Sequence, residues 1–201
     1  MKKTTHSIRR LLVLVLVLVL GMFSMIIPVQ AEDGSLSAKD RAELLAKASI
    51  SCDATGGECT AGNIDTGDFL NVTINGDCFS NAYYGRIDNK AVDARDKVAT
   101  TGTNAKTIAE LPANQLVCIL ATAAVGRGNG DIEQYVMALP WDYDATCTEN
   151  VRCRLPLPKP ESAAMLKCKA DHEAKRYNNC PQGWVFAKDM EAYPMGLPGM
   201  Q

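Results

Sequence analysis

Histidine is almost absent from this chain, and its scarcity limits the chemistry available. The 201 residues contain only His6, near the N-terminus, and His172, between Asp171 and Glu173. Serine and cysteine nucleophiles usually need a neighbouring histidine as a base. The G-x-S-x-G, H-E-x-x-H and P-loop patterns are missing as well. We therefore expect a non-enzymatic protein, and a hydrolase centred on His172 is the alternative.

Closely spaced cysteine pairs are also missing. No C-x-x-C occurs, although structural zinc sites and dithiol redox centres are usually built on such pairs. The acidic clusters at 65–68 and 142–144 do not follow the calcium-loop pattern. We expect no metal and no cofactor.

The chain also lacks a surplus of basic residues. The chain has 21 Lys+Arg against 23 Asp+Glu, and four of the basic residues lie in its first ten positions, which leaves 21 − 4 = 17 for the rest. Nucleic-acid-binding domains normally carry a basic surplus. We expect no nucleic-acid partner.

One long apolar run is present. Residues 11–29 follow a basic start and lead into Val29-Gln30-Ala31 and an acidic pair. This order is typical of a secretory signal peptide, here residues 1–31 with cleavage after Ala31. The basic start and this apolar run look bacterial, so we expect a periplasmic protein with no membrane span after cleavage. A secreted protein and an uncleaved inner-membrane anchor are alternatives, because the run is about long enough to cross a bilayer.

All eight cysteines lie downstream of that segment, between Cys52 and Cys180. An even number of cysteines in an exported chain predicts disulfides, and eight cysteines allow 105 pairings. Short loops and turn residues favour three local bridges, which leaves the remaining two cysteines to pair over a longer distance. The expected pairs are Cys52–Cys59, Cys78–Cys118, Cys147–Cys153 and Cys168–Cys180.

The pattern of residues predicts a mainly β protein with added helices. Within 32–87 we expect a helix over 37–49, capped by Ser37, then short strands that bear cysteines. Residues 69–74 end at Asn75-Gly76, a strong hairpin signal, and 79–87 are the expected return strand. Further strands are expected at 106–111, 115–122, 134–139 and 183–187. A second helix is expected over 163–177, and a disordered tail over 193–201.

The run from Ala91 to Leu120 resembles bacterial SH3-like domains. Residues 92–95 stand where that family has a strand ending in arginine, here Arg95, and 107–111 stand where it has a strand followed by a tight turn. The usual glycine of that turn is missing, and Asn114 takes its place in the expected fold. Residues 183–190 resemble the closing strand and short helical turn. The resemblance implies a small disulfide-braced SH3-like β-barrel over 88–192, with a helical insertion over about 141–182 before the last strand.

The resemblance also implies a class of ligand. SH3-like barrels bind extended peptides on aromatic surfaces between loops, so we expect an exported binding module that recognises a peptide, peptidoglycan or another cell-wall component, or an envelope protein. A secreted inhibitor or immunity-type protein that blocks a toxic or hydrolytic enzyme is the alternative. We expect Trp184 in the core. The candidate binding residues are Tyr83, Tyr84, Arg95, Trp141 and Tyr143.

Overall fold

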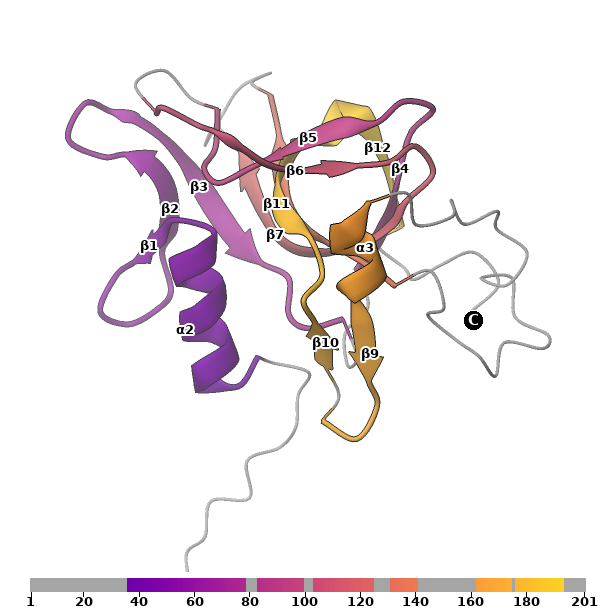
Figure 1. Ribbon diagram of the computed structural model, residues 1–201. Coiled ribbons are helices and arrows are strands. Elements are labelled where there is room, and N and C mark those ends of the chain that lie inside the picture. The colour runs from indigo at the N-terminus through magenta and orange to yellow at the C-terminus, as the bar shows by residue number, and fades with distance from the viewer. Residues whose placement is uncertain are drawn as a thin grey trace, which may run out of the picture. The chain divides into compact units, whose positions relative to one another are not determined.

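The computed structural model describes residues 36–78, 83–99, 103–124, 131–140, 162–174 and 176–193. Within these residues the protein is mainly antiparallel β-sheet with short helices, as the sequence predicts (Figure 1). None of the helices in this part of the chain is long and apolar enough to cross a bilayer. The expected signal peptide lies outside the described residues, and so does the expected tail, apart from Tyr193.

Twelve strands, two helices and a 3-10 turn are described here. The strands before the insertion are β1 (Ile50–Cys52), β2 (Cys59–Asn63), β3 (Asp68–Ile74), β4 (Tyr84–Ile87), β5 (Val92–Arg95), β6 (Thr107–Leu111), β7 (Leu116–Ala124) and β8 (Glu133–Ala138). The later strands are β9 (Lys169–Asp171), β10 (Arg176–Asn178), β11 (Gln182–Phe186) and β12 (Met190–Tyr193). The helices are α2 (Ala38–Lys47) and α3 (Ala163–Lys167), and the 3-10 turn is η2 (Ala187–Asp189).

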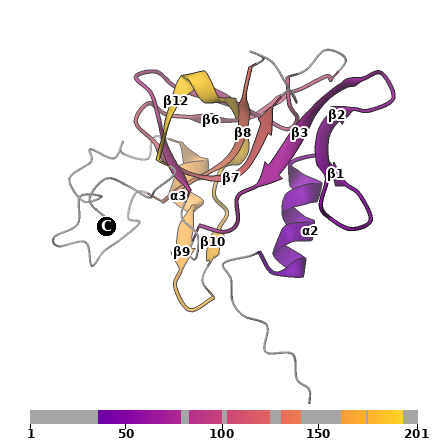
Figure 2. The same cartoon turned by 180° about the vertical axis from the view of Figure 1, so that it is seen from behind.

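Helix α2 begins where the sequence predicts. The Ser37 hydroxyl oxygen accepts a hydrogen bond from the Asp40 backbone N–H at 3.1 Å, and the hydroxyl donates to the Asp40 carboxylate at 2.6 Å. A side chain in this position satisfies a backbone donor that the helix itself leaves unpaired. Leu44 and Ala48 are buried in the same cluster as Ile50 and Leu70. Helix α2 therefore covers the inner face of the first strands, and Figure 2 shows it beside them from behind.

Strand β7 is the centre of the main sheet. The strand order is β1-β2-β3-β7-β8-β11-β5-β6, and β4 pairs with both β7 and β12. Residues 121–124 of β7 pair with β3, and residues 116–118 pair with β4. Among the described residues the hydrogen-bonded ladder does not close into a ring, because β6 and β12 each pair with a single strand.

The hairpin expected at Asn75-Gly76 is wrong. Strand β3 pairs with β2 and β7, and β4 is not its partner. Contacts distant in sequence override the local turn signal: the Asn75 backbone N–H donates to the Leu120 carbonyl at 2.9 Å, and its side-chain amide donates to the Thr122 hydroxyl at 3.0 Å. The disulfide between Cys78 and Cys118 then joins the end of this segment to β7.

The insertion before β11 is less helical than expected. Helix α3 ends at Lys167, and the residues that follow form the antiparallel pair β9–β10, so the helix expected over 163–177 is wrong beyond its first turn. The disulfide between Cys168 and Cys180 joins the two ends of this hairpin region, with 4.2 Å between their Cα atoms. That short distance favours a returning hairpin over a continuing helix. Strand β11 is also not the last strand, because η2 leads from it into β12.

The disulfides match the expected pairing as far as the structure describes it. Cys52–Cys59, Cys78–Cys118 and Cys168–Cys180 are bonded. Cys147 and Cys153 lie outside the described residues. Such bonds persist in oxidising compartments outside the cytosol.

Two groups of buried side chains hold the sheet. The first lies under α2 and includes Trp184, whose indole N–H donates to the Ala48 carbonyl at 2.8 Å. The second contains buried residues from β4–β8, β11 and β12, and Met165 of α3. Among them are Ile87, Leu111, Val136 and Val185. The expectation that Trp184 belongs to the core is confirmed. Asn114 has a φ of 65°, the left-handed conformation predicted for it.

Candidate functional site

The structure describes three of the five candidate binding residues and places them in different surroundings. Tyr84 is buried, and its hydroxyl donates to the Cys78 carbonyl at 2.9 Å, so it is a core residue and not part of a binding face. Tyr83 is half-buried and packs against the second core group. Arg95 lies at the end of β5 beside β11. Trp141 and Tyr143 lie outside the described residues.

Arg95 forms a largely buried ion pair with Glu133. Its guanidinium lies 2.7 Å from the Glu133 carboxylate, and the two side chains are 15% and 3% exposed. The other carboxylate oxygen of Glu133 accepts the Ala99 backbone N–H at 2.8 Å. Burial raises the pKa of Glu133, while the Ala99 N–H and Arg95 act in the opposite direction. The pair joins the end of β5 to the start of β8.

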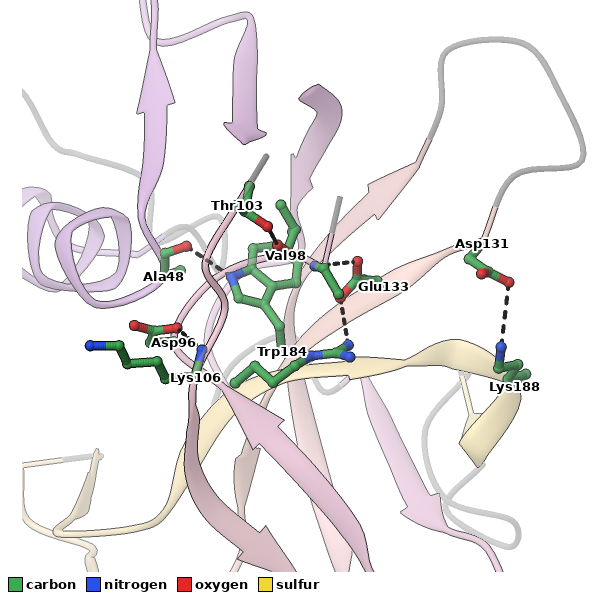
Figure 3. A network of polar contacts seen from close by, with 11 residues as sticks. Ala48, Asp96, Val98, Thr103, Lys106, Asp131, Glu133, Trp184 and Lys188 are labelled. Carbon is green, nitrogen blue, oxygen red and sulfur yellow. Dashed lines mark hydrogen bonds and ion pairs between the residues drawn. The ribbon is translucent and has the colours of Figure 1, made fainter. Parts of the chain in front are cut away.

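Two cations lie near the ring of Phe186, beside this ion pair. The Arg95 guanidinium carbon is 4.1 Å from the ring centroid, and the Lys188 ammonium is 4.5 Å from it. Lys188 also pairs with Asp131 at 3.6 Å, as Figure 3 shows. Cations over an aromatic ring are attracted to its π face. The ring is therefore held in position while it remains half-exposed.

An exposed apolar residue precedes β8, next to the end of β11. Ile132 is 45% exposed, and its carbonyl accepts the Ala187 backbone N–H at 2.8 Å. We call Asp131, Ile132, Phe186 and Lys188 the loop face. It combines an exposed apolar side chain, a half-buried ring and one charge of each sign where β8 begins and β11 ends.

The loop between β5 and β6 is fixed next to the loop face. The Asp96 carboxylate accepts the Lys106 backbone N–H at 2.7 Å, and the Asp96 N–H donates to the Lys106 carbonyl at 3.0 Å. Val98 is buried and its carbonyl accepts the Thr103 hydroxyl (Figure 3). These contacts anchor the two described ends of the loop, residues 96–99 and 103–106.

Sequence reasoning missed Phe186, Lys188, Ile132 and Asp131. These residues come from separate parts of the chain, and no local sequence motif contains all of them. One signal was available: Phe186 follows Trp184 by two residues, so both side chains face the same side of β11. Trp184 is fully buried, and a second aromatic residue at the end of that strand marks the border of the core.

A hollow lies between α2 and the β9–β10 hairpin. Its volume is about 240 Å³. Its buried lining residues include Cys78, Leu44 and Leu120. Its charged lining residues are Lys39, Lys47 and Arg176 against Asp40, Glu43 and Asp77. Because these charges balance, the hollow does not select a charged ligand, and we take the loop face as the candidate site.

His172 lies in the exposed turn between β9 and β10, away from the loop face. No group of three metal-binding side chains occurs among the residues that the structure describes. A comparison of this chain with models of protein families, with characterised proteins and with solved structures finds no match. Its function is therefore inferred from its residues and their geometry.

Proposed function

We propose that this protein is an exported, non-enzymatic binding module with an SH3-like barrel, and that the loop face recognises a peptide, a cell-wall component or an envelope protein. The observation that carries the binding role is the half-buried ring of Phe186 at the end of β11, near exposed Ile132 and beside a largely buried ion pair. Preorganised loops bind with less loss of conformational entropy than mobile ones.

The order of elements supports the SH3-like barrel. Strand β5 ends at Arg95, β6 leads into a turn with left-handed Asn114, β7 is apolar, and η2 follows β11. This is the order in which the sequence resembles the family. The insertion expected over 141–182 falls between β8 and β11.

The last connection supports a curled sheet. Five strands follow one another in the order β12-β4-β7-β8-β11, so a flat arrangement would separate the end strands by about 19 Å, which is four times the usual spacing. Yet the three residues of η2 join β11 to β12. A 3-10 turn of that length spans about 6 Å. This short connection supports end strands that lie close together, as in a small barrel.

The disulfides and the N-terminal sequence support export. Three disulfides brace the described residues, and such bonds are rare in the reducing cytosol. Residues 1–31 have the order of a secretory signal peptide. Together they favour the periplasm as the place where the module works.

The test compares two binding assays on the mature chain. Purified sacculi are used for cosedimentation, and immobilised protein is used to capture partners from envelope extracts. We expect Phe186→Ala and Lys188→Glu to reduce the binding of whichever partner is found by at least about five-fold, since contacts at the centre of an interface are each worth more than about 1 kcal/mol. Leu166→Ala, at an exposed apolar residue of α3, is the matched control.

The outcomes separate the possible partners. Cosedimentation with sacculi that is lost in both variants supports recognition of the cell wall. Capture of one envelope protein by the wild type, and not by either variant, supports recognition of a protein. Capture of a single enzyme with inhibition of its activity supports the inhibitor alternative. Binding that is equal in wild type, Phe186→Ala and Lys188→Glu would exclude the loop face.

A further inference from the structure

The outer face of the first strands carries hydroxyl and amide side chains and one aromatic ring. Residues that pair directly in an antiparallel ladder point to the same side. Ser51, Thr60 and Asn71 form one such row across β1, β2 and β3. Thr73 lies two residues beyond Asn71 on the same strand, and Phe69 lies two residues before it. We call Ser51, Thr60, Phe69, Asn71 and Thr73 the hydroxyl face.

The two sides of these strands differ in chemistry. The inner side holds Ile50, Ala61, Leu70 and Val72, which are buried in the core under α2. The hydroxyl face is open: Ser51, Phe69, Asn71 and Thr73 are exposed, and Thr60 is half-buried. Its five residues include no Lys, Arg, Asp or Glu, and the exposed residues Asp53 and Glu58 border it beyond Ser51 and Thr60. Depletion of charge together with an exposed aromatic ring is typical of binding surfaces and differs from ordinary protein surface.

The polar groups of this face have capacity to bind. Within the described part of the chain, the side chains of Thr60, Asn71 and Thr73 make no hydrogen bond. An asparagine amide offers two donors and an acceptor, and each threonine hydroxyl offers a donor and an acceptor. The neighbouring Thr122 hydroxyl accepts the Asn75 amide, which holds that end of the surface in place.

Gly62 leaves the aromatic ring uncovered. It stands directly opposite Phe69 in the β2–β3 ladder, where any other residue would place a side chain beside the ring. Its φ of 113° is also a conformation that glycine adopts more readily than other residues. Phe69 is 38% exposed as a result of this open position.

We propose that the hydroxyl face binds an uncharged polysaccharide strand. The C–H face of a pyranose ring packs on Phe69, and the sugar hydroxyls exchange hydrogen bonds with Asn71, Thr73 and Thr60. Strands about 4.8 Å apart present these groups in regular rows, which suits a regular polymer. An anionic ligand would lose its hydration here without gaining an opposite charge. The surface lies outside residues 83–193, so the inference does not depend on the SH3-like module.

The experiment measures binding of two soluble oligosaccharides to the full mature chain. Tetra-N-acetylchitotetraose and cellotetraose are titrated by calorimetry and by amide chemical shifts. We expect millimolar or tighter binding of at least one of them, weakened at least about five-fold by Phe69→Ala and by Asn71→Ala. Ile108→Ala, at an exposed residue of β6, is the control and should bind as wild type does.

Several results would overturn the inference. They are the absence of binding by both oligosaccharides at millimolar concentration, binding unaffected by Phe69→Ala and Asn71→Ala, and shift changes that map outside β1–β3. Thr73→Lys adds a charge at an exposed position and should also weaken binding. It serves as the test if thermal unfolding shows that Phe69→Ala is not folded. Loss of sacculus binding in loop-face variants with oligosaccharide binding intact would show that the two surfaces act separately.

Discussion

Asn114 shows how one residue supports a turn between two strands. Its φ is 65°, and its backbone N–H donates to the carbonyls of Ile87 and Asp88 at 3.0 and 3.2 Å. The left-handed conformation costs about 1–2 kcal/mol for most residues, and asparagine and glycine tolerate it best. The backbone bonds do not require the Asn114 side chain, so the conformation alone selects the residue.

Substitution at Asn114 should follow backbone preference. We expect Asn114→Gly to remain within about 0.5 kcal/mol of wild type, and Asn114→Ala to lose about 1 kcal/mol because alanine is strained at this φ. Urea unfolding of the three proteins measures the difference. An alanine variant as stable as the glycine variant would contradict this explanation of the turn.

Glu133 should make stability depend on pH. Burial raises its pKa in the folded protein above the value of 4.5 in the unfolded chain. A raised carboxyl pKa contributes stability below the unfolded value, and that contribution is lost as the pH rises through the folded value. Glu133→Gln removes the titration. The unfolding free energy of wild type minus that of Glu133→Gln should therefore decrease from acidic to neutral pH, as measured by urea unfolding at each pH. A difference that stays constant or increases with pH would contradict the effect of burial.

At the scale of elements, strand positions were predictable and strand partners were not. Residues 107–111, 116–124 and 133–138 are strands because apolar and β-branched residues fill them, and short-range pattern is enough to show this. The partner of β3 depends on contacts of Asn75 with β7, 44 and 47 residues away in sequence. The Asn75-Gly76 pair carries no information about those contacts.

The candidate site was less predictable than the fold. Arg95 was found through the family resemblance, and it does lie beside the loop face. Tyr84 was chosen for its aromatic ring, although it ends in the core because β4 lies between two other strands. Side-chain type alone does not show which side of a strand faces solvent.

Trp184 should anchor α2 to the sheet. Its indole N–H donates to the Ala48 carbonyl at the end of the helix, and both residues are fully buried. Trp184→Phe removes the donor and some volume, so we expect a loss of about 2–4 kcal/mol. Trp184→Phe should also increase the rate of hydrogen exchange more in α2 than in β2, because β2 has no bond to Trp184. Equal changes in α2 and β2 would indicate a general loss of packing and contradict a specific anchor.

At the scale of the whole molecule, the disulfides should contribute unequally. Cys78–Cys118 closes a separation of 40 residues and Cys52–Cys59 closes one of 7. In the chain-entropy model these loops are worth about 4 and about 2 kcal/mol. Guanidinium unfolding should therefore show a larger loss for Cys78→Ala/Cys118→Ala than for Cys52→Ala/Cys59→Ala. The reverse order would mean that local strain or packing outweighs loop entropy.

The two surfaces that we propose for binding differ in chemistry. The loop face combines a ring, an apolar side chain and charges of both signs, whereas the hydroxyl face has no charge. A cell-wall polymer that carries both peptides and sugars would fit the two together. Attachment of both surfaces to one rigid sheet would then increase the overall affinity beyond that of either surface.

The most direct measurement of the binding role is a titration of the isotopically labelled mature chain with soluble peptide-bearing fragments of a sacculus digest, followed by amide chemical shifts. We predict shift changes centred on Ile132, Phe186 and Lys188, and their loss in Phe186→Ala. Two results would contradict the assignment of the loop face as the binding site. One is that no amide shift changes with saturating fragments and envelope extract, and the other is that the shift changes centre on the hollow between α2 and the β9–β10 hairpin.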